Sequence, residues 1–374
     1  MRVGIDVSAV TTAPTGVGTY IRAILAETLR QAAPGEEFLG FSSGLADMDA
    51  ATLSGLHMRR HLRVPTRALY QCWNLLGTPK PDALLGGVDV YHATNFFLPP
   101  VARARRILTI YDLTFLRHPE WSSPKIVGPF SRSVRKHAQA ADAILTCSEA
   151  SKRDIAELLD CPAEKITVAY GAADSLFQPV DCERAREDVF AHHGIEGPYI
   201  LFLSTVEPRK NIEGLLAAFS RLLDTVPHTL VLVGREGWNQ EPLPAMIARH
   251  GVQGRVRHVG YVRDRADLPK LYAAADAFVL PSFYEGFGIP ILEAMACGCP
   301  VVTTRRASLP ECGGEAALYV EPDDPDNIAH GIRKVLQSPE LAADLRARGL
   351  DQAAKFTWAG AARTVLDLYR SLAS

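Results

Sequence analysis

The stretch Glu285-Gly286-Phe287-Gly288-Ile289-Pro290-Ile291-Leu292-Glu293 follows a short apolar run and leads into a helical pattern. Glycines let backbone N–H groups approach a ligand closely, and a helix N-terminus attracts phosphate. Pro290 suits the first helical turn, where a missing N–H costs nothing. Glu285 stands in the loop and Glu293 about one turn inside the helix, so both carboxylates can accept hydrogen bonds from ligand hydroxyls. The stretch therefore predicts a strand–loop–helix binding site rather than an ordinary capped helix with a solvated glutamate.

Short apolar runs alternate with helix-length amphipathic stretches on both sides of this segment. The runs are continuously apolar, which is typical of parallel strands buried on both faces. Their order predicts βαβ units in a parallel sheet, formed twice along the chain. The expected strands are Arg2–Val7, Val88–His92, Arg106–Tyr111, Ala143–Cys147, Ile166–Ala169, Tyr199–Ser204, Thr229–Gly234, Val256–Val259, Ala277–Pro281 and Pro300–Thr303; the expected helices include Thr19–Gln31, Ser148–Leu159, Ile212–Val226, Pro290–Cys297 and Trp358–Leu372.

A length of 374 residues exceeds one ordinary core, so two domains are expected. Loop-like sequence between residues 171 and 198 separates the two halves. We expect an N-terminal domain over 1–180, a C-terminal domain over 181–355, and a last helix over 356–374 that packs on either one. Ligands of parallel sheets bind beyond the carboxyl ends of the strands. Two such domains would form a cleft at their facing loops, so the loops directly after strands are the candidate sites.

The composition, with 47% hydrophobic residues, 22% charged residues and a net charge of −2, is typical of a soluble globular protein. No apolar run reaches the roughly eighteen residues that span a bilayer, and the first residues resemble a strand rather than a secretion signal. The seven cysteines are scattered, which predicts reduced thiols and no zinc site. Charge is uneven, because residues 51–140 hold 13 Lys+Arg but 4 Asp+Glu. That stretch suits an anionic partner, such as a membrane face, or is simply an Arg-rich solvated surface.

A second candidate segment is Ser204-Thr205-Val206-Glu207-Pro208-Arg209-Lys210-Asn211, between an expected strand and an expected helix. Arg209 offers a planar fork and Lys210 a movable point charge. Two adjacent cations at such a position suit a diphosphate. The alternative is an exposed basic turn.

Four weaker segments also follow expected strands. Glycines in Gly16-Val17-Gly18 would let backbone amides line a cleft, unless this is only a surface loop. Asp112 in Tyr111-Asp112 would direct a carboxylate into the cleft. His92 has the same placement, but such a residue is as often a structural cap. The backbone of Tyr261 and Val262 would contact the edge of a nucleotide base.

Together these segments resemble the family-4 retaining glycosyltransferases over essentially the whole chain. The specific features are the Glu-x7-Glu pair of Glu285 and Glu293 and the Arg209-Lys210 pair; Gly16-Val17-Gly18 and Glu321-Pro322-Asp323-Asp324 support them. The resemblance implies the α/β GT-B fold, with two Rossmann-like domains whose parallel sheets face a central cleft. It also implies that the N-terminal domain serves the acceptor and the C-terminal domain binds a nucleotide sugar.

The resemblance assigns roles to individual residues. It implies that Glu285 lies near the donor hexose, that Glu293 holds the ribose hydroxyls, and that Arg209 and Lys210 bind the diphosphate. The loop amides of Gly286, Phe287, Gly288 and Ile289 would serve the hexose and phosphate, and Ser204 would also contact the donor. Many relatives have His-Asp where this chain has Tyr111-Asp112, so Asp112 is retained and a histidine role is lost.

The implied reaction is transfer of a hexose with retention of anomeric configuration. The sequence of Ser204–Asn211 is most similar to the corresponding segment of bacterial mannosyltransferases of surface-polysaccharide or O-antigen assembly. This similarity favours GDP-mannose as donor. A glycan or polyprenyl-diphosphate-linked acceptor is implied, with no nucleic acid, no cofactor and no metal. The acids of Asp47-Met48-Asp49 and Asp324-Pro325-Asp326 are interpreted as loop acids. The implied location is the cytoplasm, with peripheral contact at the inner face of the membrane left open.

Several alternatives stay open at this point. A UDP-glucose or other UDP-hexose transferase of the same fold would have the same motifs. A sugar phosphorylase or nucleotide-sugar epimerase would also use Arg209 and Lys210 on phosphate. A non-catalytic sugar-binding relative is a further alternative, although the intact motif set argues against it. An NAD-dependent oxidoreductase is disfavoured, because Ile21 stands where the dinucleotide fingerprint has its third glycine.

Overall fold

The computed structural model describes residues 1–12, 15–238 and 241–374. Contacts divide the chain into two compact units. The first unit holds Met1–Leu116, Lys125–Gly171 and Thr357–Ser374; the second holds Arg117–Pro124 and Ala172–Phe356. The chain thus changes unit after Gly171, rather than at the expected residue 180. The short Arg117–Pro124 segment joins the second unit because Trp121 stacks on Phe283, with ring centroids 5.4 Å apart.

The first unit is built on a seven-stranded, entirely parallel sheet with the order β3-β2-β1-β4-β5-β6-β7. Ile5 of the central strand pairs with Gly40 on one side and His92 on the other. Two strands at one edge, β2 and β3, were not predicted from the sequence. The middle of β3 is Arg59-Arg60-His61, all exposed, so no apolar run marks it. The strands are β1 Arg2–Asp6, β2 Glu37–Ser43, β3 Met58–Leu62, β4 Val90–Ala93, β5 Arg105–Thr109, β6 Ala143–Thr146 and β7 Ile166–Val168.

The second unit contains a six-stranded parallel sheet with the order β10-β9-β8-β11-β12-β13. From β8 the chain adds β9 and then β10 on one side of the sheet. It then returns to the middle and adds β11, β12 and β13 on the other side. This is the doubly wound Rossmann order, and the direction reverses between β8 and β11. The expected parallel Rossmann-like sheets are therefore confirmed in both units. The strands are β8 Tyr199–Leu203, β9 Thr229–Val233, β10 Val256–Gly260, β11 Ala277–Leu280, β12 Val301–Thr304 and β13 Ala317–Val320.

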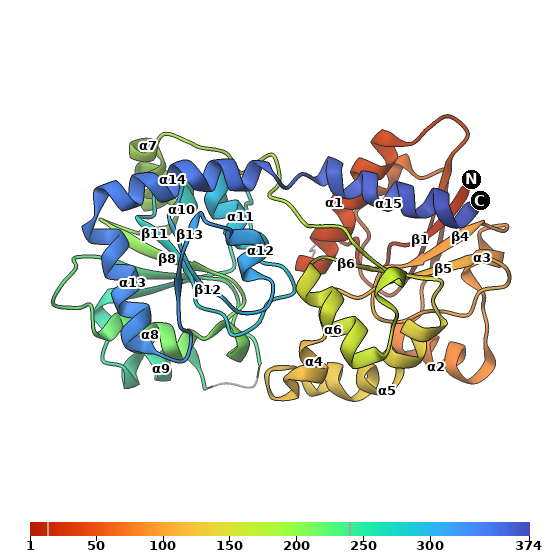
Figure 1. Cartoon of the computed structure of the whole chain (residues 1–374), viewed down its shortest axis with the longest axis horizontal. Helices are drawn as coiled ribbons and strands as arrows, with labels where there is room; N and C mark the ends of the chain where they lie inside the picture. The colour runs from red at the N-terminus through yellow and green to blue at the C-terminus, as the bar shows by residue number, and fades with distance from the viewer. Residues whose placement is uncertain (13–14, 239–240) are drawn as a thin grey trace. The chain divides into compact units, whose positions relative to one another are not determined.

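Helices connect the strands and cover the sheets, as right-handed parallel crossovers require (Figure 1). Among the described residues, no helix is both long and apolar enough to cross a membrane. The α-helices are α1 Gly16–Gln31, α2 Thr66–Leu76, α3 Pro81–Leu84, α4 Thr114–Arg117, α5 Pro124–Ala140, α6 Glu149–Leu159, α7 Cys182–His193, α8 Ile212–Ser220, α9 Leu243–Arg249, α10 Asp267–Ala273, α11 Ile289–Ala296, α12 Leu309–Gly313, α13 Pro325–Gln337, α14 Pro339–Ala354 and α15 Trp358–Ala373.

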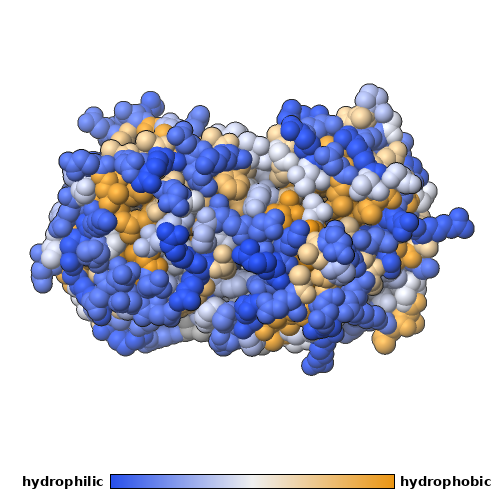
Figure 2. Space-filling model, in the orientation of Figure 1, coloured by the Kyte–Doolittle hydropathy of each residue, from blue (hydrophilic) through white to orange (hydrophobic). Residues whose placement is uncertain are grey.

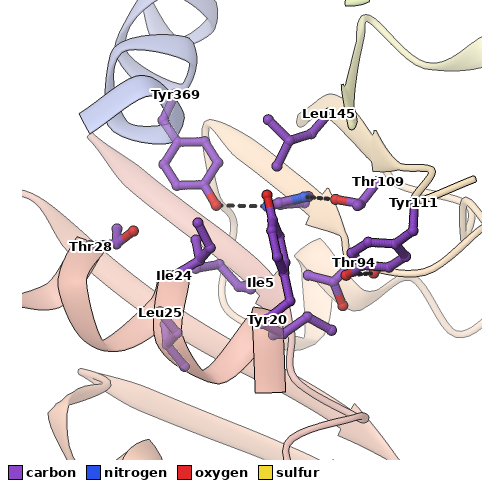
Figure 3. Close-up of a pocket in the computed structure, with 12 residues that line it drawn as sticks. Ile5, Tyr20, Ile24, Leu25, Thr28, Thr94, Thr109, Tyr111, Leu145 and Tyr369 are labelled. Carbon is purple, nitrogen blue, oxygen red and sulfur yellow. Dashed lines mark hydrogen bonds between the residues drawn. The ribbon is translucent and has the colours of Figure 1, made fainter. Parts of the chain in front are cut away.

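The last helix, α15, packs along α1 of the first unit. Tyr369 of α15 places its hydroxyl 2.7 Å from Nδ1 of His92, whose Nε2 lies 2.7 Å from Oγ1 of Thr109 (Figure 3). The Tyr20 ring of α1 meets the Trp358 ring edge-on, with centroids 5.5 Å apart. Burial lowers the pKa of His92 to about 3, so the imidazole is neutral and serves as a hydrogen-bonding link. His92 is thus a structural residue that ties two neighbouring strands to the C-terminal helix.

Candidate functional site

The candidate site lies where the order of the second sheet reverses, beyond the carboxyl ends of β8 and β11. After β8, Pro208–Lys210 form a single 3₁₀ turn, and Asn211 caps α8 in the left-handed region at φ 58°. The Asn211 amide donates to the carbonyl oxygens of Pro281 and Pro322, at 3.2 and 2.7 Å. One side chain thus joins the loops after β8, β11 and β13. Parallel sheets bind ligands at such a switch point.

Glu285, from the loop after β11, is held by both cations of the loop after β8. Its Oε1 accepts hydrogen bonds from Lys210 Nζ at 2.5 Å and from Ser282 Oγ at 2.8 Å. Its Oε2 accepts from an Arg209 guanidinium nitrogen at 2.9 Å. Arg209 Nε also donates to Glu207, which is 2% exposed. The structure therefore brings three predicted residues into one buried network of two cations and two carboxylates.

Burial and charge act in opposite directions on this network. Burial by itself raises the pKa of Glu285, but attraction to Lys210 and Arg209 outweighs it, so the pKa is lowered overall. Burial, followed by repulsion from Arg209, lowers the pKa of Lys210 despite Glu285 and Glu207. Shifted pKa values of this kind are characteristic of functional sites, although structural ion-pair networks share them. This arrangement therefore favours the ionised form of Glu285.

The glycine loop after Glu285 adopts the backbone that its sequence predicts. Gly288 has φ 121°, a conformation open to glycine but strained for other residues, and α11 begins at the next residue. The hydroxyl of Ser308 lies 2.8 Å from the Glu285 carbonyl oxygen and 2.7 Å from that of Phe287. The loop carbonyls therefore point into the protein and fix the backbone. The first N–H groups of a helix have no partner within the helix, which makes this end of α11 suited to an anion.

Glu293 lies on α11, away from the cation pair. Its Oε2 accepts a hydrogen bond from the Tyr272 hydroxyl of α10 at 3.0 Å. Burial raises the pKa of Glu293 to about 7, against the opposing effects of the Tyr272 hydrogen bond and of Arg265. At neutral pH this carboxyl is therefore poised between its two forms, and it can both donate and accept hydrogen bonds.

The ends of β8, β9 and β10 form the other side of the site. Gly234 has φ 139°, and a Cβ there would lie 1.9 Å from the Ser204 carbonyl oxygen, so the loops after β8 and β9 touch through backbone. The Arg235 guanidinium lies over the Tyr261 ring, 4.1 Å from its centroid. Tyr261 is 48% exposed, whereas Val262 is buried. The exposed Tyr261 face with its cation is the feature here that could meet a base.

The predicted residues of the first unit have local roles in the structure. Gly16-Val17-Gly18 do not form a loop, because they are the first turn of α1 and Thr15 Oγ1 accepts from Gly18 N at 3.3 Å. Asp112 accepts from the backbone N–H of Thr114 at 3.0 Å. Tyr111 is buried, and its hydroxyl donates to the Thr94 carbonyl oxygen at 2.8 Å.

Several residues that shape the site were not predicted from the sequence. Ser282, Ser308 and Tyr272 hold the predicted carboxylates and loop, but isolated serines and a tyrosine inside helix and loop sequence give no periodic signal. Arg235 was detectable, since it directly follows a strand and Gly234. Over residues 1–12, 15–238 and 241–374, no group of three or more His, Cys, Asp and Glu side chains could hold a metal ion.

A doubly wound sheet with a glycine loop, a helix N-terminus and paired cations at its switch point is the arrangement of a Rossmann-like domain, and the sheet of the first unit has the same winding. The model of glycosyl transferases group 1 matches residues 185–352. The O-antigen chain mannosyltransferase B of Escherichia coli is 38% identical over 289 residues, which are 76% of this chain and 74% of the relative. This chain therefore belongs to the group 1 glycosyltransferases, and it is a glycosyltransferase.

A second curated protein and a solved structure are also similar to this chain. Glycogen synthase of Mycobacterium tuberculosis is 32% identical over 299 residues, covering 75% of this chain and 68% of the relative. The Anabaena protein Alr3699/HepE, solved in complex with UDP-glucose, superposes with a TM-score of 0.77 at 19% identity over 99% of this chain and all of that one. The expected GT-B fold of two Rossmann-like domains is confirmed.

Proposed function

We propose that the chain transfers a mannosyl residue from GDP-mannose to a hydroxyl of a glycan or polyprenyl-diphosphate-linked glycan, with retention of configuration. The observation that carries the proposal is the Glu285 carboxylate held by Lys210 and Arg209 at the switch point. The 38% identity to a mannosyltransferase of O-antigen assembly supports the sugar and the acceptor class.

The proposed donor pose follows the charges of the second unit. The diphosphate lies against Arg209, Lys210 and the start of α11. The hexose lies at Glu285 and at the backbone amides of residues 286–289. Glu293 holds the ribose hydroxyls, and the base lies near Tyr261 and Val262, with Ser204 beside the phosphates. In the first unit, Gly16–Gly18 offer the helix N-terminal amides of α1, and Asp112 is proposed to contact the reacting groups.

In the proposed reaction, the bond between the anomeric carbon and the diphosphate oxygen breaks, and that oxygen keeps the electron pair. The acceptor oxygen forms its bond to the anomeric carbon on the same face, and its proton passes to the departing phosphate oxygen. Charge that develops on the diphosphate is stabilised by Arg209, Lys210 and the loop amides. Donors prearranged at developing charge are commonly the largest contribution to such a rate enhancement.

The experiment is a thermal-shift panel of GDP, UDP, ADP and TDP sugars, followed by transfer assays. A ligand that binds only the folded state raises the melting temperature with the logarithm of its concentration over Kd. We expect GDP-mannose to give the largest shift, and an α-linked product from the α-linked donor by NMR. A larger shift and faster turnover with another donor would reject GDP-mannose.

The second candidate is transfer of glucose from UDP-glucose. It is favoured by the 32% identity to a glycogen synthase and by the UDP-glucose complex of a protein with the same fold. The same panel separates the two donors. A sugar phosphorylase is distinguished by turnover with free phosphate and no nucleotide, and an epimerase by turnover of the nucleotide sugar without an acceptor.

A further inference from the structure

Helix α2 of the first unit is anchored firmly on one side. Leu69 and Trp73 are 4% and 6% exposed and belong to the core of the unit. Trp73 donates its indole N–H to the Pro79 carbonyl oxygen at 2.6 Å. Tyr70 stacks on Phe97 with ring centroids 4.1 Å apart and nearly parallel rings. The helix is therefore held rigidly, so its exposed residues keep a fixed position on the protein surface.

Helix α2 ends in two exposed leucines, of which Leu75 lies on the side away from Leu69 and Trp73. Leu75 is 82% and Leu76 71% exposed, the highest values among the large hydrophobic residues of the described chain. They lie at the last turn, before Gly77 closes the helix with φ 64°. The exposed face of α2 begins with one cation, Arg67, and ends with the two leucines. The exposed residues of the helix are Arg67, Ala68, Gln71, Cys72, Asn74, Leu75 and Leu76.

The stretch of chain that contains these leucines is strongly basic. The stretch from residue 50 to residue 81 contains no Asp or Glu. It contains five cations, all exposed: Arg59, Arg60, Arg63, Arg67 and Lys80. Within the described parts of the chain none of the five forms an ion pair. Figure 2 shows hydrophobic surface beside hydrophilic surface in the region where Figure 1 draws α2.

We propose that this surface, Arg59–Lys80 with Leu75 and Leu76 at its tip, docks the protein onto an anionic lipid bilayer. Apolar side chains enter the boundary between headgroups and acyl chains, while arginines beside them bind lipid phosphates. A second copy of the chain fits less well, because the centres of protein interfaces are depleted of charge and five unpaired cations would repel their own copies. Docking of this kind is separate from the transfer reaction, and vesicle binding alone tests it.

The test uses the full chain and two kinds of vesicle, phosphatidylcholine alone and phosphatidylcholine with phosphatidylglycerol. We expect sedimentation with the anionic vesicles at low salt, and loss of binding as salt rises. Leu75→Ser with Leu76→Ser should lower vesicle affinity about tenfold or more, and Arg63→Gln with Arg67→Gln about thirtyfold. The matched controls are Phe190→Ser, at a 56% exposed position of the second unit, and Arg263→Gln. Circular dichroism and melting curves establish that each variant is folded.

The exposed cysteines provide a second readout. Cys72 lies on the docking face of α2, and Cys182 lies in the second unit. An environment-sensitive fluorophore on Cys72, in a Cys182→Ser background, should shift to the blue with anionic vesicles, whereas the same dye on Cys182 in a Cys72→Ser background should not. The proposal fails if the protein ignores anionic vesicles, or if the leucine variant binds like the controls. It also fails if light scattering shows that the leucines instead hold a dimer. None of these results depends on the sugar transferred.

Discussion

Lys210 Nζ lies 2.5 Å from Glu285 Oε1, although the two residues are 75 positions apart. One comes from the loop after β8 and the other from the loop after β11, the two strands at which the winding of the sheet reverses. The pair is buried and shares its carboxylate with Arg209. This contact defines the candidate site more tightly than any single motif, and each part of it can be altered separately.

Replacing Lys210 by Met should slow transfer strongly. The change removes a buried cation from the position proposed for the leaving diphosphate, and loss of one such donor costs roughly 10²–10³ in rate. Stability should fall by about 1–3 kcal/mol, since Glu285 loses one of its partners. Steady-state kinetics and urea unfolding measure the two effects. Lys334→Met, at an exposed position of α13, is the matched control. A turnover equal to that of the control would reject the assignment of Lys210.

A double-mutant cycle measures the contact itself. Lys210→Met and Glu285→Gln should each destabilise the protein, and the double variant should lose less than the sum of the two. Contacting residues in one network typically couple by roughly 0.5–3 kcal/mol, and we expect a value in the upper half of that range because both groups are buried. Additive losses would mean that the two groups do not interact in solution.

Glu293 should make stability depend on pH in a defined window. Its pKa is raised from 4.5 to about 7 in the folded protein, so the folded state binds the proton more tightly than the unfolded chain does. Its contribution is therefore fully present below about pH 4.5 and is lost as the pH rises through 7. Because the side chain is partly exposed, we expect on the order of 1–2 kcal/mol. The measurement is the free energy of unfolding of wild type minus that of Glu293→Gln, from pH 4 to 8 (roughly the range around both pKa values). A difference that stays flat across the range would contradict the raised pKa.

Gly234→Ala should be severely destabilising. The residue has φ 139°, and its new Cβ would meet the Ser204 carbonyl oxygen at 1.9 Å, a backbone atom that cannot turn aside. We expect a loss of about 3 kcal/mol or more, because steric overlap adds to the strain of the positive φ. Gly254→Ala is the control, since nothing lies within 4 Å of its added Cβ. Thermal melting of the two variants checks this, and similar melting temperatures would show that the loops after β8 and β9 are not in contact.

Tyr369→Phe should loosen the C-terminal helix. It removes the hydroxyl 2.7 Å from His92 and leaves a buried ring nitrogen without that partner, at a cost of about 1–3 kcal/mol. Hydrogen exchange of α15 should quicken as well. Tyr261→Phe, at a 48% exposed position, should change stability by less than about 0.5 kcal/mol. Equal exchange rates in α15 for wild type and Tyr369→Phe would show that the His92 contact does not hold the helix.

The sequence alone predicted much of the fold because buried parallel strands leave a direct trace. Runs such as Tyr199–Leu203 and Ala277–Leu280 are apolar on both faces, and both were predicted within one residue. Strand β3 was missed because an edge strand needs no apolar run, and its centre is Arg59-Arg60-His61. Gly16–Gly18 was predicted as a loop because glycines usually interrupt helices, whereas the Thr15 cap begins α1 there.

The features of the candidate site also fall into two groups: those that the sequence predicted and those that only the tertiary structure shows. The sequence determined the local chemistry: the glycine at φ 121°, the helix that starts after it, the adjacent cations and the two glutamates, because each depends on neighbours along the chain. Only the tertiary structure decided that Lys210 and Arg209 both bind Glu285, that Tyr272 holds Glu293, and that His92 fastens α15. Those contacts join residues far apart in sequence, and they arise from the order in which the strands pair, which no local pattern encodes.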